Sequence, residues 1–231
     1  MKFFITIFIY SITLSLSNKA NAQTKFDISA YPIHVQSKNT NKPIILFITG
    51  DGGWNSFSTQ LTNELARNGY PFIAFDSKKY FWDKKTPLQF GKDVQTILDQ
   101  YLKEWNKESF IIVGYSFGAD VCSFLPANLS KKLSDKLDAM VLLSPGYSTG
   151  FEVKLMGMLS SGGPSNSEKY KVYPELMKLK IPVSCIFGAS DDNDFKLGLK
   201  ETEFVHKIIL PGNHHFNDDI LVVSKAIIKG L

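Results

Sequence analysis

Apolar residues along the chain fall into short continuous runs that alternate with stretches of helical spacing. Continuous runs bounded by turn-forming residues predict strands that are buried on both faces of a parallel sheet. They occupy residues 43–49, 71–75, 109–113, 139–143, 182–187 and 204–210. Helical spacing lies between or after them, at residues 58–68, 88–105, 119–126 and 220–228. This alternation predicts an α/β fold, a mostly parallel sheet with helices on both faces.

Residues 145–172 interrupt this rhythm. Within them, residues 160–165 read SSGGPS, a turn-forming composition that does not suit a core. The segment follows a predicted strand, at the edge where α/β sheets bind ligands. It is therefore either a lid or wall of a binding cleft, or a solvated surface loop.

The N-terminus has the pattern of a secretory signal peptide. Lys2 precedes an apolar stretch at residues 3–16, and residues 20–22 (Ala-Asn-Ala) form a cleavage site. The apolar stretch is shorter than the roughly 20 residues that span a bilayer. We expect cleavage after Ala22, export to the periplasm and a single mature domain at residues 23–231; an uncleaved membrane anchor is the alternative.

Charge and cysteine content exclude several classes of site. The net charge is +4, and such mild basicity without a long run of like charge predicts no nucleic-acid partner. Cys122 and Cys185 lie in apolar segments, which favours two buried thiols and leaves a disulfide open. No metal-ligand spacing or phosphate-binding glycine loop occurs, so we expect neither a metal nor a cofactor. The sequence predicts no oligomeric state.

Residues 114–118 read Gly-Tyr-Ser-Phe-Gly, a G-x-S-x-G motif between a predicted strand and a predicted helix. This is the context of the nucleophile elbow of α/β-hydrolases, in which a sharp turn lifts the serine hydroxyl to a helix N-terminus. Backbone N–H groups there can bind a developing oxyanion. The motif predicts Ser116 as a nucleophile; a tight turn with an incidental serine is the alternative.

A nucleophilic serine needs a base and an orienting acid, which follow it in this fold in the order acid, then histidine. Two loops that leave predicted strands supply that order, at residues 188–194 and 211–216. We favour His215 as the base, with His214 as its competitor, because a histidine before an aromatic residue is common there in related hydrolases. His34 precedes the main sheet and His206 lies inside a strand.

The acid lies in the first of these loops, which is rich in aspartate. We favour Asp191, with Asp192 second and Asp194 third. A solvated acidic loop or a calcium site is the alternative, although a calcium loop usually spaces its oxygen ligands more widely.

Two N–H donors are needed for the oxyanion. Phe117, directly after the nucleophile, is expected to provide one. The glycine-rich turn at residues 49–54 (TGDGGW) is expected to provide the other, from Asp51 or Gly52.

Several stretches together resemble the bacterial VirJ/AcvB-type virulence-protein domain of the α/β-hydrolase superfamily. They are residues 49–54 (TGDGGW), 76–77 (DS), 80–82 (YFW), 85–87 (KTP), 114–121 (GYSFGADV), 151–153 (FEV) and 211–216 (PGNHHF). The similarity spans about residues 43–220. The sequence departs from the family at residues 191–194, which puts the choice of acid in question, and at residues 122–124, where packing changes.

The resemblance implies a periplasmic serine hydrolase of the α/β-hydrolase fold. Members are associated with hydrolysis of aminoacylated phosphatidylglycerol, especially the lysyl form, and others with secretion as accessory proteins. For an aminoacyl-lipid substrate, a carboxylate near the cleft would recognise the amine, with Asp51, Asp120 and Glu152 as candidates. Residues 80–82 (Tyr-Phe-Trp) suit either a lipid interface, which would allow peripheral membrane contact, or the core.

Two further functions remain compatible with these residues. One is a general esterase or thioesterase for soluble ester substrates. The other is a non-catalytic periplasmic binding or secretion-accessory protein that keeps the hydrolase fold. The complete order of serine, acid and histidine favours an enzyme.

Overall fold

The computed structural model of the chain describes residues 28–153 and 168–231. The expected signal peptide at residues 1–22 and the turn-forming residues 160–165 lie outside the described residues. Within the described ranges, no helix is both long and apolar enough to cross a membrane.

The centre of the fold is a seven-stranded sheet in the order β1-β3-β2-β4-β5-β8-β9. Every neighbouring pair is parallel except β1 with β3, which is antiparallel. The strands are β1 (Ile33–Gln36), β2 (Ile44–Ile48), β3 (Phe72–Phe75), β4 (Phe110–Tyr115), β5 (Leu137–Leu143), β8 (Val183–Gly188) and β9 (Val205–Leu210). The predicted mostly parallel sheet is confirmed.

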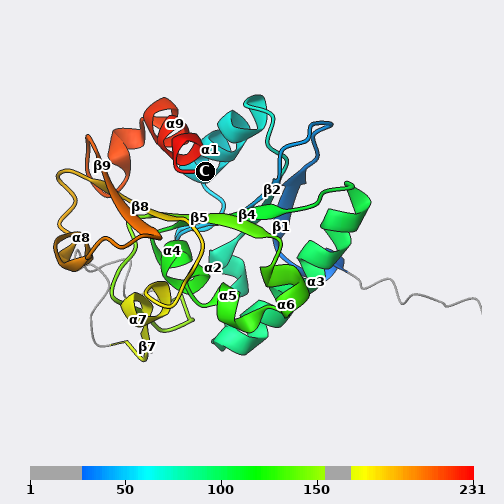
Figure 1. Cartoon of the computed structure of the whole chain (residues 1–231), viewed down its shortest axis with the longest axis horizontal. Coiled ribbons are helices and arrows are strands. Elements are labelled where there is room, and N and C mark those ends of the chain that lie inside the picture. The colour runs from blue at the N-terminus through cyan, green and yellow to red at the C-terminus, as the bar shows by residue number, and fades with distance from the viewer. Residues whose placement is uncertain (1–27, 154–167) are drawn as a thin grey trace, which may run out of the picture.

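Helices cover both faces of this sheet, as predicted. In Figure 1, α1 and α9 lie on one face and α3, α4, α5 and α7 on the other. The α-helices are α1 (Ser56–Arg67), α2 (Ser77–Tyr80), α3 (Pro87–Glu104), α4 (Phe117–Cys122), α5 (Leu125–Asn128), α6 (Lys131–Ser134), α7 (Val172–Leu176), α8 (Asp194–Gly198) and α9 (Ile220–Lys229). Two 3₁₀-helices, η1 (Ile28–Ala30) and η3 (Phe216–Asp218), complete the helical elements of the described residues.

The central strands bury side chains on both faces, which explains their continuous apolar runs. All five residues of β2 are fully buried. Leu46 belongs to the hydrophobic cluster on the side of α3, while Ile45 and Phe47 belong to the cluster beneath α1 and α9. A parallel sheet that is covered on both faces requires such strands.

Helix α3 shows how local sequence sets an element. Its N-cap, Thr86, forms a capping box with Gln89, and Pro87 occupies the first turn. Apolar residues that recur at helical spacing, among them Phe90, Val94 and Ile97, face the core. The helix therefore begins within one residue of the predicted position.

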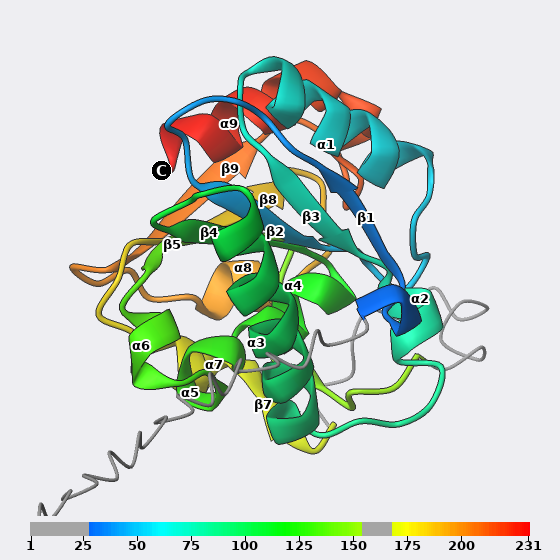
Figure 2. The same cartoon turned by 90° about the vertical axis from the view of Figure 1, so that its right-hand side faces the viewer.

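The placement of His34 before the main sheet is wrong. His34 lies in β1, the edge strand that pairs with β3 (Figure 2). The four residues of β1 alternate weakly and are mostly half-buried, so the run carries little of the signal of a central strand. His206 lies in β9, as expected. Cys122 and Cys185 are buried free thiols rather than a disulfide.

The described ends of the 145–172 segment pack into the fold. A two-stranded antiparallel sheet joins β6 (Ser148–Thr149) to β7 (Tyr170–Lys171). Phe151 is fully buried, with its ring 5.9 Å from that of Phe81 and 5.3 Å from that of Phe124. These ends are therefore part of the molecule's body, while residues 154–167 lie outside the described residues.

Candidate active site

Ser116 occupies a sharp turn between β4 and α4. Its φ of 52° and ψ of −119° lie in a region that side-chain-bearing residues rarely adopt. The flanking glycines permit this turn because a Cβ on Gly118 would lie 2.2 Å from the carbonyl oxygen of Ile48, and one on Gly114 would lie 2.6 Å from the Cα of Ala119. The strand–turn–helix context predicted from the motif is present.

A hydrogen-bonded chain runs from Ser116 through a histidine to an aspartate. The Nε2 atom of His214 lies 2.9 Å from Ser116 Oγ. Its Nδ1 atom lies 3.1 Å and 3.3 Å from the two carboxylate oxygens of Asp191. The three residues follow β4, β9 and β8, whose carboxyl ends meet at the same edge of the parallel sheet.

The loops that carry the aspartate and the histidine touch through their backbones. A Cβ on Gly188, the last residue of β8, would lie 2.1 Å from the carbonyl oxygen of Asn213. Ser190 N–H also donates to Gly212 O at 2.9 Å. This close approach is what brings Asp191 within reach of His214.

The prediction that His215 faces Ser116 is wrong, because His214 is the histidine that lies next to the serine. The side chain of His215 is exposed, and its Nδ1 atom lies 2.8 Å from the hydroxyl oxygen of Tyr115. Burial raises the pKa of Tyr115, so its hydroxyl remains a donor. The two imidazole rings stand 84° apart. On so tight a turn, neighbouring side chains point in different directions, and the sequence alone does not say which one meets the serine.

The preferred acid, Asp191, is the aspartate that the structure brings to the histidine. Only 7% of it is exposed. Burial acts to raise its pKa, but the hydrogen bond and charge of His214 and the charge of Lys196 together hold the pKa below its usual 3.8. The carboxylate is therefore ionised at neutral pH.

Asp192 and Asp194 point elsewhere. Both are exposed, and no hydrogen bond joins either side chain to His214 among the described residues. Asp194 opens α8 directly after its N-cap, Asn193.

Lys196 fixes the acid loop and was not anticipated from the sequence. Its ammonium donates to the carbonyl oxygens of Gly188 and Ala189, each at 3.1 Å, and to that of Asp191. A lysine in an acidic surface loop resembles any solvated charge, so no local pattern could have singled it out.

The two expected sources of oxyanion donors lie side by side. Phe117 is the first residue of α4. A Cβ on Gly50, in the turn after β2, would lie 3.5 Å from Ser116 Cβ. Within the described ranges, the backbone N–H groups of Phe117, Asp51 and Gly52 donate to no protein acceptor. They are thus available beside the serine; their donation to an oxyanion remains a prediction.

The three candidate carboxylates for an amine differ in access. Asp120 is buried, and its carboxylate accepts a 2.6 Å hydrogen bond from the N–H of Gly146. Burial raises the pKa of Asp120 to about 8, against that hydrogen bond, and the charge of Asp51 adds to the rise. Asp51 and Glu152 are both partly exposed, and Asp51 lies on the turn beside the serine.

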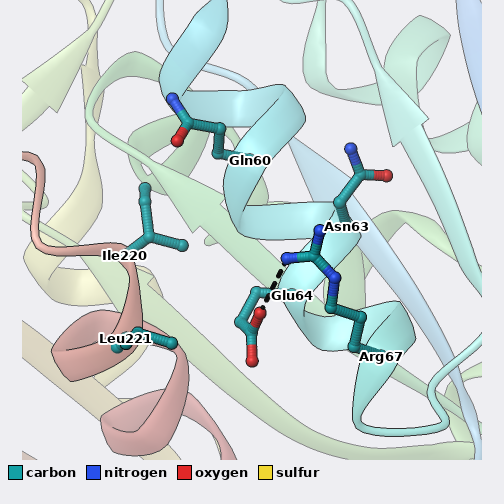
Figure 3. Close-up of a pocket in the computed structure, with 6 residues that line it drawn as sticks. All are labelled: Gln60, Asn63, Glu64, Arg67, Ile220 and Leu221. Atoms are coloured by element: carbon teal, nitrogen blue, oxygen red, sulfur yellow. Dashed lines mark hydrogen bonds and ion pairs between the residues drawn. The ribbon is translucent and has the colours of Figure 1, made fainter.

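A cavity of about 630 Å³ opens beside this turn. It is lined by Gly52, Gly53, Trp54, Asp76, Lys78, Lys79, Trp82 and Asp83. A smaller pocket of about 260 Å³ lies between α1 and α9, where Arg67 and Glu64 form a 3.1 Å ion pair (Figure 3). The smaller pocket contains none of the predicted site residues, whereas the lining of the larger one includes Gly52, a candidate oxyanion donor.

The described residues include no cluster of three or more histidine, cysteine, aspartate or glutamate side chains that could hold a metal ion. That the site works without a metal stays a prediction from the sequence.

Comparison with known proteins gives one family and a set of related folds. The family model described as bacterial virulence protein (VirJ) matches residues 42–231. No curated protein sequence matches the chain.

Solved structures of similar fold include hydrolases of several kinds. The enol-lactonase from Burkholderia xenovorans LB400 has a TM-score of 0.63 at 13% identity, over 86% of this chain and 95% of that one. Est1E from Butyrivibrio proteoclasticus with ferulic acid bound has a TM-score of 0.59 at 16% identity, over 85% and 92%. An alpha-beta serine hydrolase homologue from Coxiella burnetii has a TM-score of 0.57 at 15% identity, over 86% and 90%. At these identities the likeness establishes the α/β-hydrolase fold alone.

Proposed function

The chain belongs to the bacterial virulence protein (VirJ) family, and on that premise we propose that it is a serine hydrolase of carboxyl esters. Ser116 is the nucleophile, His214 the general base and Asp191 the orienting acid. The observation that carries the proposal is the unbroken chain of hydrogen bonds from Ser116 Oγ through His214 to Asp191. A serine and histidine within hydrogen-bond reach, with the histidine oriented by a third group, is the geometry of an activated nucleophile.

The chemistry follows from this geometry. As Ser116 Oγ attacks the ester carbonyl carbon, its proton passes to His214 Nε2. The carbonyl oxygen becomes an oxyanion, which the N–H groups of Phe117 and of Asp51 or Gly52 stabilise. The intermediate collapses when the ester C–O bond breaks, and His214 returns the proton to the departing alcohol. This leaves an acyl group on Ser116.

A water molecule completes the cycle. It attacks the acyl carbonyl while His214 accepts its proton, and the collapse releases the carboxylic acid and restores the Ser116 hydroxyl. Asp191 remains ionised throughout, since its pKa lies below the usual range. Its negative charge stabilises the imidazolium of His214 in both halves of the reaction.

For the substrate we propose an aminoacyl ester of phosphatidylglycerol, with the lysyl form first. The family resemblance supports this class of lipid, and the ester lies next to a cationic amine. Of the candidate carboxylates, Asp51 is the best placed to bind the amine because it is partly exposed on the turn beside Ser116. Asp120 is withdrawn into the protein, where burial raises its pKa to about 8.

We also propose that the enzyme acts in the periplasm. The sequence of residues 1–22 supports export with cleavage after Ala22. The product lipid would then be formed at the periplasmic face of a membrane.

Mass spectrometry of lipid extracts tests the function. The wild-type protein should convert lysyl-phosphatidylglycerol to phosphatidylglycerol and lysine, and the Ser116→Ala variant should not. If the wild type leaves this lipid unchanged but cleaves a short activated ester, the enzyme is a general esterase or thioesterase. Inertness toward both substrates would favour a non-catalytic accessory protein.

The amine contact is tested by comparing two carboxylate variants. Asp51→Asn keeps the backbone N–H and should raise KM for the aminoacyl lipid by about tenfold, the scale of one charge-assisted contact. KM for a neutral ester should not change. Glu152→Gln is the matched variant, and a rise in KM there instead would transfer the amine contact to Glu152.

A further inference from the structure

Exposed cationic and aromatic side chains gather at the wall of the cavity beside Gly52. Lys78, Lys79 and Trp82 line this cavity together. Trp82 is 53% exposed, one of few large apolar side chains so open among the described residues. Lys84 is exposed two residues further along. We call Lys78, Lys79, Trp82 and Lys84 the Trp82 rim.

Positive charge is concentrated at this rim. Residues 76–85 contain four lysines and two aspartates, a net charge of +2, which is half of the +4 that the whole chain carries. Lys79 forms an ion pair with Asp76 at 3.4 Å, yet its side chain is 68% exposed. Among the described residues, Lys78 and Lys84 have no ion-pair partner. The side chains of Lys78 and Lys84 are thus open to solvent, and that of Lys79 is largely open despite its ion pair.

The buried neighbours of Trp82 anchor the segment from which its side chain projects. Phe81 is fully buried, and its ring lies 5.1 Å from that of Phe117, the residue after the candidate nucleophile. Tyr80 is 8% exposed and donates its hydroxyl hydrogen to Asp93. Residues 80–82 therefore divide between the core, which takes Tyr80 and Phe81, and the surface, where Trp82 projects. The segment is anchored close to Ser116.

A second tryptophan flanks the same cavity. The ring of Trp54 stacks on His34 with centroids 4.3 Å apart. Trp54 follows directly from the turn that carries Asp51 and Gly52. Indole rings combine an apolar body with a polar N–H, and they are favoured at the level of lipid headgroups.

We propose that the Trp82 rim docks the protein on an anionic phospholipid bilayer. The lysine ammonium groups pair with lipid phosphates, since basic side chains are attracted to the negative potential of such a surface. The Trp82 ring enters the headgroup region, where it loses contact with water. Docking at the rim brings the bilayer to the cavity beside Gly52. The docking itself does not require hydrolysis; its benefit to catalysis rests on the proposed function.

Sedimentation of the exported form, residues 23–231, with vesicles tests the docking without any catalytic readout. Vesicles of phosphatidylglycerol present the anionic surface and carry no aminoacyl ester, and vesicles of phosphatidylcholine present a zwitterionic one. The wild type should bind phosphatidylglycerol vesicles more strongly, and the preference should weaken as salt screens the charges. Equal binding to both vesicles would overturn the proposal.

Two variants separate the charged and the aromatic contributions. A triple substitution, Lys78→Gln with Lys79→Gln and Lys84→Gln, should weaken binding to phosphatidylglycerol vesicles about a hundredfold, since one basic residue near the surface is worth roughly fivefold. Trp82→Ser should weaken it about tenfold through lost apolar burial. Both variants should keep the circular dichroism melting curve of the wild type, because the substituted side chains are exposed.

The controls place matched substitutions elsewhere on the surface. Lys132, Lys200 and Lys225 are exposed, and Leu221 is 57% exposed. Replacing these three lysines by Gln, or Leu221 by Ser, should leave vesicle binding close to that of the wild type. All proteins share the same N-terminus, so a difference between them reports the substituted surface. If the rim variants bind as the wild type does, or if the controls lose as much, the rim is not the docking surface.

Discussion

Two neighbouring histidines face different partners in this protein. His214 lies between Ser116 and Asp191, whereas His215 contacts the hydroxyl of Tyr115. That hydrogen bond ties the turn to the residue before the nucleophile. His215 therefore holds the turn in place, and His214 is the histidine whose ring lies within hydrogen-bond distance of Ser116.

Separate alanine substitutions distinguish the two residues. His214→Ala should lower kcat for ester hydrolysis by at least about 10⁴-fold, the scale of losing a triad member. His215→Ala leaves the Ser116–His214–Asp191 contacts in place and should lower kcat by roughly tenfold or less. Steady-state kinetics on a short ester provides the measurement. An equal loss in the two variants would contradict a single catalytic histidine.

The sequence could predict the position of Ser116 on a turn between a strand and a helix, because the signal is local, a glycine two residues away on each side. The place of Asp191 in the loop after a strand favours it as the acid. The choice between His214 and His215 depends on how the turn at residues 211–216 is oriented. That orientation is fixed by buried Phe216 and by contact with Gly188, which are tertiary features.

At the scale of secondary-structure elements, the close packing of α4 against β2 determines the shape of the turn at Ser116. Helix α4 approaches the end of β2 so closely that Gly118 has no room for a side chain, with Ile48 O and Thr49 O 2.2 Å and 2.4 Å from a Cβ built there. Gly52, on the neighbouring turn, is different, because the only close atom is the side-chain nitrogen of Asn55 at 3.2 Å.

These two glycines make a matched pair for substitution. Gly118→Ala forces the backbone of α4 away from the end of β2. This overpacking should lower the free energy of unfolding by about 2 kcal/mol or more. Gly52→Ala needs only a flexible side chain to move and should change it by less than about 0.5 kcal/mol. Urea denaturation measures both. Similar stabilities for the two variants would show that the elbow is less tightly packed than the structure indicates.

Long, strongly patterned elements were predictable from sequence, and short ones were not. The predicted helix at residues 88–105 is α3, displaced by one residue. The predicted helix at residues 119–126 is instead α4 followed by α5, which has Pro126 in its first turn. Proline lacks the N–H that would continue the earlier helix. Helices as short as α6 and α8 are set by tertiary packing and carry no periodic signal.

At the scale of the whole molecule, one buried carboxylate makes folding stability depend on pH. Burial raises the pKa of Asp120 from its ordinary 3.8 to about 8 in the folded protein, with the Gly146 hydrogen bond opposing the rise. Between these values the folded state holds a proton that the unfolded state has released. The contribution of Asp120 to stability is thus present at acidic pH and is lost as pH rises through about 8.

Asp120→Asn removes this titration while keeping an oxygen to accept from Gly146. The free energy of unfolding of the variant minus that of the wild type should be larger at pH 9 than at pH 5. Urea denaturation of both proteins at the two pH values gives the comparison, in which the contributions of other titrating groups cancel. A difference in stability that does not change with pH would contradict a protonated Asp120 in the folded protein.

The fold brings the candidate catalytic groups to one edge of the sheet. Loops after β2, β4, β8 and β9 carry the candidate oxyanion donors, Ser116, Asp191 and His214. The Trp82 rim follows β3 at the same edge, so docking and hydrolysis would share one face of the molecule.

The most direct test of the central claim is labelling with a fluorophosphonate probe, which reacts covalently with activated serines. Mass spectrometry of the intact protein and its peptides should find one adduct, on Ser116. The adduct should be absent in Ser116→Ala and strongly slowed in His214→Ala, because the hydroxyl then has no base. An adduct at another residue, labelling that does not depend on His214, or no labelling of the folded wild type would contradict the account.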